Sequence, residues 1–326
     1  MKAMRLRIVF LGTADFAVPT LEALAKGPDD IATVVTRPDR PAGRGRKLRP
    51  PQVKAAAEGL GLRILQPERI SRPPGPELLR GLSPDLLLVA AYGEILSREV
   101  LSLPRLGAVN LHASLLPHYR GAAPIQRALL AGERETGVTV QWMAEELDAG
   151  DIILQRALPV GEEESLGSLH DRLAALGAEA VGEAMDLIRK GEAPRVPQDA
   201  EHATFAPPIK LEELAIDWRR PASGIARQIR AFSPRPSART SRGKTLLKVL
   251  VAREEGGGAR EGVPGRVAEI SVEGFCVEAG EGRLRVLRVQ PAGGRAMSAT
   301  DYVRGHRLLR GEVLGAAGTS SEPDSS

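Results

Sequence analysis

Cysteine is almost absent from this chain, which holds one, Cys276, among 326 residues. A single cysteine excludes a disulfide within the chain and favours a reducing compartment, the cytoplasm. The histidines show no metal-ligand spacing with that cysteine, so we expect no metal site. They are the five residues His112, His118, His170, His202 and His306.

Long hydrophobic runs are also missing. None approaches the roughly twenty apolar residues that a membrane-spanning helix needs. The start, MKAMRLRIVFLG, places basic residues before apolar ones as a signal peptide does, but the run is too short and Asp15 interrupts it. We interpret it as a first β-strand, and we expect a soluble cytoplasmic protein without a membrane partner.

Strand-like apolar runs alternate with helical segments through the first half of the chain. This alternation predicts an α/β fold, with a Rossmann-like, mostly parallel sheet and helices on both faces. Strands are expected at 6–11, 31–36, 63–65, 85–91 and 108–112, and helices at 21–25, 53–60 and 77–82. Residues 165–190 repeat apolar side chains at helical spacing, which predicts a long amphipathic helix that closes the domain.

The second half has a different pattern. Residues 191–208 hold four prolines and little periodicity, as a linker does. A helix at 221–232 precedes short strand candidates at 245–251, 265–270, 274–278 and 283–289, and this pattern predicts a small β-barrel. The predicted domain boundaries are 1–192, a linker at 193–209, a barrel at 210–315 and a disordered tail at 316–326.

Charge divides at the same boundary. Residues 210–315 hold 20 Lys and Arg against 12 Asp and Glu, whereas residues 1–209 hold 25 against 27. A basic barrel indicates a polyanionic partner, although a merely solvated surface gives the same count.

A basic loop at 37–49 is a second concentration of positive charge. It carries Arg37, Arg40, Arg44, Arg46, Lys47 and Arg49 against Asp39 alone. Its prolines and glycines predict that it forms no regular element. A flexible arm of arginines is suited to gripping phosphates and stacking on unpaired bases, and the alternative is a solvated loop.

The segment 107–151 concentrates candidate catalytic residues. Alternation along the strand at 108–112 points Asn110 and His112 to one face, at the carboxyl end where open α/β sheets bind ligands. Asp148 lies in a turn after a strand expected at 137–143. Taken singly, each of the three has a structural interpretation. Together they provide an amide, an imidazole and a carboxylate, which suit a tetrahedral oxyanion and its proton transfers.

The motifs N-x-H, SLLP and LDAGD, at 110–112, 114–117 and 147–151, resemble those of the folate-dependent formyltransferases. FLGTADFAVPTLEAL, RPDRPAGRGRKL and QPAGGRAMSATDYVRG extend the likeness over residues 5–312, and they are most similar to the members that formylate methionyl-tRNA. The resemblance implies that residues 1–192 bind folate and carry catalysis, and that 210–315 form an OB-like tRNA-binding barrel.

The resemblance also implies the substrates and the roles of residues. The formyl donor is 10-formyltetrahydrofolate, and the acceptor is the α-amine of methionyl-initiator tRNA. Asn110 and His112 stabilise the oxyanion, and Asp148 orients His112 and favours its charged form. The loop residues Arg37, Arg40, Arg44, Arg46 and Lys47 are expected to bind tRNA, and the protein is expected to be a monomer. The folate pocket is expected to be lined by Ser114, Leu115, Leu116, Pro117, Ala90, Ala91, Tyr92 and Gly93.

Two other interpretations remain at this point. One is a formyltransferase for a small amine, such as a sugar nucleotide or glycinamide ribonucleotide, which has no need of both basic regions. The other is a non-catalytic RNA-binding relative, against which the intact trio argues. The chain also departs from the family pattern at Phe205, Pro208 and Arg235, which weakens the mapping of the linker and the second domain.

Overall fold

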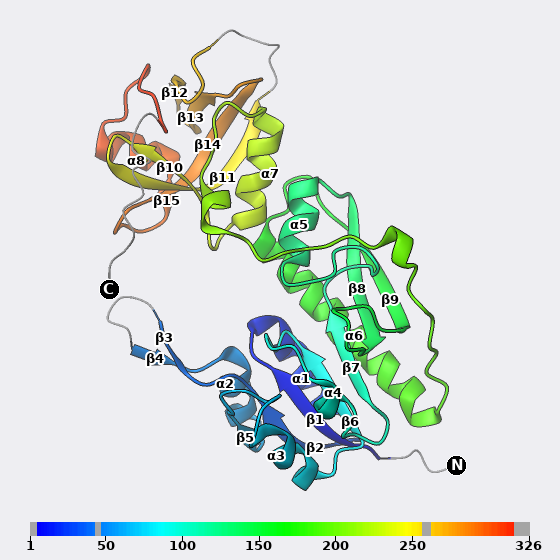
Figure 1. Ribbon diagram of the computed structural model, residues 1–326. Coiled ribbons are helices and arrows are strands. Elements are labelled where there is room, and N and C mark those ends of the chain that lie inside the picture. The colour runs from blue at the N-terminus through cyan, green and yellow to red at the C-terminus, as the bar shows by residue number, and fades with distance from the viewer. Residues whose placement is uncertain (1–4, 43–46, 256–261, 316–326) are drawn as a thin grey trace. The chain divides into compact units, whose positions relative to one another are not determined.

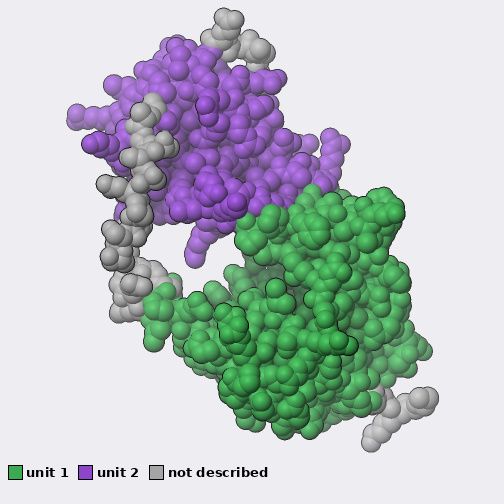
Figure 2. Space-filling model, viewed as in Figure 1, with its two compact units in different colours: residues 1–124, 135–159, 170–208 green, residues 125–134, 160–169, 209–326 purple. Residues whose placement is uncertain are grey.

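The computed structural model describes residues 5–42, 47–255 and 262–315. The chain divides into two compact units, coloured separately in Figure 2. Unit 1 comprises Met1–Pro124, Glu135–Pro159 and His170–Pro208, and unit 2 comprises Ile125–Arg134, Val160–Leu169 and Ile209–Ser326. Two stretches from the middle of the sequence therefore pack with the C-terminal residues, a grouping that linear boundaries do not express.

Unit 1 is built on a seven-stranded sheet with the order β5-β2-β1-β6-β7-β8-β9 (Figure 1). The strands from β5 to β7 run parallel, and β8 and β9 are antiparallel to their neighbours. The apolar run of β6, LLLVA, is buried throughout, as expected for a parallel strand covered on both faces. The bounds are β1 Arg7–Gly12, β2 Asp30–Val35, β5 Ile64–Leu65, β6 Leu86–Ala90, β7 Ala108–His112, β8 Glu135–Trp142 and β9 Ile152–Pro159.

Helices cover both faces of this sheet. On one face, Val9, Leu87 and Ala108 belong to a buried cluster with Leu79 of α3 and Val100 of α4. On the other face, α6 approaches β7 so closely that a Cβ at Gly177 would lie 2.7 Å from Leu111 Cδ2. The predicted α/β fold is therefore confirmed. The helix bounds are α1 Val18–Ala25, α2 Gln52–Gly59, α3 Gly75–Leu82, α4 Arg98–Leu101 and α6 Leu166–Lys190, with short 3-10 helices at Asp15–Ala17 and Ala200–His202.

The basic loop corrects one prediction. It contains two short antiparallel strands, β3 (Arg40–Ala42) and β4 (Lys47–Arg49), so it is not free of regular structure. Proline has no backbone N–H to donate to a neighbouring strand. A hairpin of two strands tolerates Pro41, because each strand has a neighbour on one side only. Arg44 and Arg46 lie outside the described residues, and of Lys47 only the backbone in β4 is described.

The segment predicted as a linker follows unit 1 closely. Val196 exchanges backbone hydrogen bonds with Ile152, and Ala206 with Arg120 and Ala123. Pro208 is the last residue of this unit, and Phe205 is exposed there. The predicted boundary at 193–209 remains a prediction, but most of this segment is bound to the first unit by its own backbone.

Unit 2 contains an antiparallel sheet with the order β10-β11-β14-β13-β12, and β15 pairs with β14. Residues 311–315 hydrogen-bond to Val267, the first residue of β12, to Gly265 just before it and to Ser241 of β10, so they bridge the two ends of the sheet. The small antiparallel β domain is thus confirmed. The bounds are α5 Pro124–Ala131, α7 Ala222–Phe232, α8 Ala299–His306, β10 Ala238–Arg242, β11 Thr245–Glu255, β12 Val267–Ser271, β13 Gly274–Glu278, β14 Arg283–Pro291 and β15 Met297–Ser298, with a 3-10 helix at Leu211–Leu214.

Helix α5 belongs to unit 2 through specific contacts. Arg127 Nη2 donates to Glu213 Oε1 at 3.0 Å, across 86 residues of sequence. A chain cut near residue 209 would therefore lose the packing partners of α5, so the C-terminal domain is better tested by substitution than by truncation. Within the described residues, no helix is long and apolar enough to cross a membrane.

Candidate active site

Strand β7 places Asn110 and His112 side by side at its carboxyl end. Asn110 pairs in register with Gln141 of β8, and His112 with Thr139. Asn110 is 9% exposed and His112 6% exposed, so each polar side chain is buried and needs partners within the fold. Both belong to the sheet face that carries Leu87 and Val89, as alternation along β7 predicts.

Asp148 supplies those partners from the turn between β8 and β9. Its Oδ1 lies 3.5 Å from Asn110 Nδ2 and 3.4 Å from Gln141 Nε2, and its Oδ2 accepts a hydrogen bond from the backbone N–H of Gly121 at 2.9 Å. His112 Nδ1 lies 3.6 Å from the same Oδ2. The predicted trio is therefore brought together, with the carboxylate at its centre.

The backbone at Asp148 adopts an uncommon conformation to reach this point. Its φ is +49°, in the left-handed region that aspartate tolerates better than most residues. Gly150 follows, and a Cβ there would lie 1.8 Å from the carbonyl oxygen of Trp142. The turn therefore needs a residue that tolerates a positive φ at position 148 and a glycine at position 150, and strained turns of this kind are concentrated at functional sites.

The two ring nitrogens of His112 have different partners. Nε2 lies 2.9 Å from the carbonyl oxygen of Tyr119, which can only accept a hydrogen bond. Nε2 therefore carries a proton in this arrangement, and Nδ1 faces the Asp148 carboxylate. The carboxylate therefore lies beside the ring nitrogen that does not contact Tyr119.

Gln198 and Arg120 form a second layer that the sequence did not reveal. Gln198 Nε2 donates at 2.8 Å to the carbonyl oxygens of Asp148 and Gly150, and its Oε1 accepts from Arg120 Nη2 at 2.8 Å. Arg120 is buried, and this amide satisfies part of its hydrogen-bonding capacity. Thr139 and Gln141 alternate with apolar residues in the strand VTVQW, and this pattern could have placed Gln141 on the same face of the sheet as the site. Gln198 lies in the segment predicted as a linker, where no pattern points to the site.

Gly121 offers a test of the carboxylate's environment. Its φ is +120°, and an added Cβ would lie 2.8 Å from the carbonyl oxygen of Ala206. Gly121→Ala should displace the N–H that binds Asp148, so we expect the free energy of unfolding to fall by about 2 kcal/mol, the scale of a hydrogen bond to a charged group. We also expect turnover to fall, by about tenfold or more. Denaturant unfolding and steady-state kinetics measure the two effects.

Gly182→Ala is the matched control for Gly121→Ala. Gly182 lies in α6 with nothing within 4 Å of an added Cβ. Alanine there should leave turnover unchanged and stabilise the helix by about 0.5–1 kcal/mol. If Gly121→Ala behaves like this control, the Gly121 N–H does not hold Asp148 in place.

The predicted folate residues 114–117 lie directly after β7. Ser114 and Leu116 are buried, and Ser114 Oγ donates to the carbonyl oxygen of His118 at 2.6 Å. Leu115 packs against Gly137, where an added Cβ would lie 2.6 Å from Leu115 Cδ2. These side chains contribute to the protein interior, and any contact with a ligand at Ser114 or Leu116 is left mainly to the backbone.

The predicted folate residues 90–93 lie where β6 ends and the chain turns. Two of them have a positive φ, +43° at Ala91 and +82° at Gly93. Ala91 O accepts from the backbone N–H groups of Thr13 and Ala14, and Thr13 Oγ1 donates to Tyr92 O at 2.7 Å. The Tyr92 side chain is buried among apolar residues, and burial raises the pKa of its phenol. Ala90 is buried, whereas Ala91 and Gly93 expose their backbone at the carboxyl edge.

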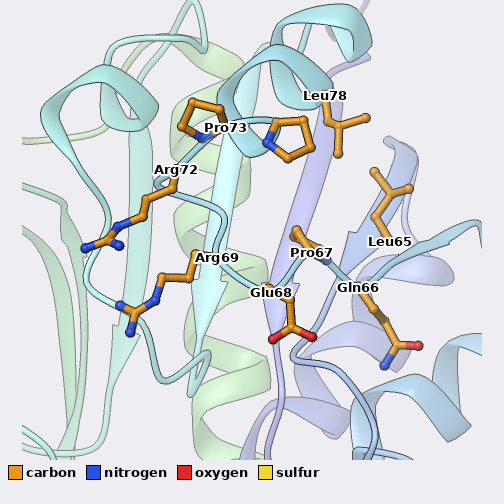
Figure 3. Close-up of a pocket in the computed structure, with 9 residues that line it drawn as sticks. Leu65, Gln66, Pro67, Glu68, Arg69, Arg72, Pro73 and Leu78 are labelled. Atoms are coloured by element: carbon orange, nitrogen blue, oxygen red, sulfur yellow. The ribbon is translucent and has the colours of Figure 1, made fainter.

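A separate pocket of about 560 Å³ lies beyond β5 at the same sheet edge (Figure 3). It is lined by residues 65–69, 72–74 and Leu78, so none of the predicted folate residues takes part in it. Arg69 and Arg72 extend from the loop that enters α3, and Gln66 lies on the opposite side of the view (Figure 3). Gln66 Nε2 donates to Arg37 O at 2.9 Å, which joins this pocket to the base of the basic hairpin.

Comparisons with known proteins identify the family of this chain. A formyl transferase family model matches residues 6–185, and a model of the formyl transferase C-terminal domain matches residues 208–307. The methionyl-tRNA formyltransferase of Moorella thermoacetica is 52% identical over 310 residues, which cover 95% of this chain and 99% of that one. The corresponding enzyme of Halorhodospira halophila is 48% identical over 311 residues, which cover 95% and 100%.

A solved structure supports the fold. The N-formyltransferase from Helicobacter canadensis, in complex with folinic acid and dTDP-3-aminofucose, superposes with a TM-score of 0.65 over 86% of this chain and 98% of its own. Its sequence is 18% identical, so it shows a shared fold and no more. With both family models and full-length relatives in agreement, the chain belongs to the formyl transferase family and, within it, to the methionyl-tRNA formyltransferases.

Proposed function

We propose that this protein transfers the formyl group of 10-formyltetrahydrofolate to the α-amine of methionyl-initiator tRNA, and that Asn110, His112 and Asp148 carry the reaction. The observation that supports the assignment most strongly is the convergence on Asp148. One carboxylate meets the Asn110 amide, the Gly121 N–H and His112 within a buried site at the carboxyl end of β7.

The chemistry needs a stabilised oxyanion and a route for one proton. The amine nitrogen attacks the formyl carbon, a new C–N bond forms, and the carbonyl oxygen becomes an oxyanion. The bond between the formyl carbon and N10 then breaks, and the amine's proton replaces the formyl group on N10. Asn110 has two amide N–H groups, of which one is directed at Asp148, so the other can be directed at the oxyanion.

His112 and Asp148 suit the proton transfers. An imidazolium at His112 would supply positive charge beside the developing oxyanion, and Asp148 Oδ2, 3.6 Å from Nδ1, is placed to orient the ring. For Nε2 to act on the substrate, His112 would exchange its contact with the carbonyl oxygen of Tyr119 for one with the reacting group. No covalent enzyme intermediate is needed, because the nucleophile is the acceptor's own amine.

The donor is proposed to bind along the backbone at 90–93 and 114–117. The chain turns at Ala91 and Gly93, which are both exposed at the sheet edge where open α/β sheets bind ligands, and a pterin's hydrogen-bonding edge needs donors and acceptors there. This arrangement relies on main-chain groups, since the side chains of Tyr92, Ser114 and Leu116 are buried.

The acceptor is tested by direct assay. Formyl transfer from labelled 10-formyltetrahydrofolate should be efficient with charged initiator tRNA and much slower with charged elongator tRNA. Free amino sugars on nucleotides and glycinamide ribonucleotide serve as competing acceptors. Efficient transfer to one of these amines, without transfer to initiator tRNA, would replace the proposed acceptor while leaving the trio's role intact.

A further inference from the structure

Glu94 is a buried carboxylate that directly follows the proposed folate segment. Its side chain is 7% exposed, and its Oε2 binds Arg37 Nη1 at 3.0 Å. The same carboxylate accepts the backbone N–H of Ile70 at 3.3 Å and that of Ser71 at 3.2 Å. One side chain thus joins three segments that lie far apart in the sequence: the start of the basic hairpin, the loop before α3 and the segment after β6.

Arg37 is held through its guanidinium and through both of its backbone polar groups. Its guanidinium is bound to Glu94, its N–H donates to Thr13 Oγ1 at 3.4 Å, and its carbonyl oxygen accepts from Gln66 at 2.9 Å. A side chain that already neutralises a buried carboxylate is poorly suited to bind a phosphate, because leaving that carboxylate unpaired would be costly. The position of Arg37 fits a structural brace.

A second tie holds the same end of the hairpin. Lys54 Nζ lies 3.0 and 2.8 Å from the two carboxylate oxygens of Asp39, and Gln66 Nε2 donates to Asp39 Oδ1 at 2.8 Å. The hydrogen bonds from Gln66 and Lys54 lower the pKa of Asp39, so this carboxylate stays ionised at neutral pH. The base of the hairpin is therefore fixed at two charged residues, Arg37 and Asp39.

The strands beyond this base present two guanidiniums together. Arg40 of β3 and Arg49 of β4 are directly opposite in register, and both are exposed. Like charges at facing positions of an antiparallel pair destabilise it. In the part of the chain that the structure describes, neither side chain has an acidic partner, so a bound phosphate would relieve their repulsion.

We propose that Glu94 is a positioning residue for tRNA: by holding Arg37 it fixes the base of the hairpin, so that Arg40 and Arg49 together receive a phosphate of the tRNA acceptor end. This inference rests on the proposed function, because it assumes a tRNA acceptor. It assigns Glu94 a role that sequence reasoning did not, it pairs Arg49 with Arg40, and it makes Arg37 a support for phosphate binding instead of a ligand.

The test is Glu94→Gln in the full-length protein, which removes the ion pair at nearly constant volume. We expect the KM for charged initiator tRNA to rise about tenfold, the cost of loosening two phosphate contacts. We expect kcat at saturating tRNA and the KM for 10-formyltetrahydrofolate to change less than about twofold, since the trio is untouched. A merely structural role would lower stability without this separation of KM from kcat.

Salt dependence identifies the contacts. Replacing Arg40 and Arg49 together with alanine should lower the slope of log affinity for tRNA against log salt by about 1, because the two guanidiniums share one phosphate. In a Glu94→Gln background the same pair should cost much less, because its contacts are already loosened. Arg37→Met should raise the KM for tRNA as Glu94→Gln does. In an Arg37→Met background, replacing Arg40 and Arg49 should likewise cost less affinity than it does in the wild type. Full additivity of Glu94→Gln with the arginine pair would overturn the inference.

Asp29→Asn is the matched control. Asp29 is also a buried carboxylate that binds an arginine, Arg189, at 2.6 Å. It lies just before the amino end of β2, whereas Glu94 lies beyond the carboxyl end of β6. It should lower stability and leave both KM values unchanged. If Glu94→Gln behaves in the same way while the wild type formylates initiator tRNA, the positioning role is wrong and the proposed function stands. If the wild type does not formylate that tRNA, the proposed function itself fails.

Discussion

His112→Ala is expected to lower kcat for formyl transfer by at least about a hundredfold, the typical loss when one group that stabilises an oxyanion is removed. Asn110→Ala and Asp148→Ala should have effects of the same size, because the Asp148 carboxylate lies 3.5 Å from Asn110 Nδ2 and 3.6 Å from His112 Nδ1 and is placed to orient both. Binding of 10-formyltetrahydrofolate should change much less, since these groups act mainly in the transition state. Single-turnover kinetics and equilibrium binding separate the two effects.

His170→Ala is the control for the loss of an imidazole. His170 lies in the same unit, 3.3 Å from Asp15 Oδ1 and edge-on to the ring of Phe16, and its partners are different residues from those of the trio. It should affect stability more than turnover. Near-normal turnover in a folded His112→Ala variant would remove histidine from the mechanism. Combined variants of the trio should be far from additive, as expected for residues that act as one unit.

Substitutions in the basic loop at 37–49 should have the second largest effect on formyl transfer to tRNA. Replacing Arg40, Arg44 and Arg46 together with alanine is expected to lower kcat/KM for charged initiator tRNA by about a hundredfold at moderate salt, through the loss of phosphate contacts. The affinity for 10-formyltetrahydrofolate should be unchanged, because the proposed folate segments lie on other loops. Discrimination against elongator tRNA should also fall if the hairpin contacts unpaired bases at the acceptor end.

Arg63→Ala controls for the loss of positive charge alone. Arg63 is exposed and lies at the amino end of β5, whereas the hairpin follows the carboxyl end of the neighbouring strand β2. It should leave kcat/KM for tRNA unchanged. Normal formylation of initiator tRNA by the triple variant would make the hairpin a bystander, and a small-amine acceptor would then become the better interpretation.

Local sequence pattern was enough for the fold class and for the core of the site. The strands of unit 1 were visible because buried parallel strands are apolar runs, and the helices because apolar residues recur with their period. Asn110 and His112 could be placed together because the pleat of a strand sends residues two apart to the same face. These are properties of a few neighbouring residues, so no knowledge of the rest of the chain was required.

Prediction was weaker where the backbone conformation depends on small local differences. The prolines and glycines of the basic loop predict no strand, yet Pro41 lies in β3. A proline excludes only a hydrogen bond at its own nitrogen, and a two-stranded hairpin leaves half of its backbone groups unpaired. The sequence identified which residues were charged there, but not that Arg40 and Arg49 face each other across a hairpin.

What the sequence by itself determined is the chemistry available to this protein: an α/β sheet with Asn110 and His112 at its carboxyl edge, Asp148 within reach, and two basic regions suited to a polyanion. What only the tertiary structure decided is which groups meet across long stretches of chain. Gln198 reaches the carbonyl oxygen of Asp148 from 50 residues away, Glu94 holds Arg37 from 57 residues away, and α5 joins the C-terminal unit through Glu213. Such contacts depend on where the backbone returns after each loop, which packing of the whole chain determines and no local pattern records.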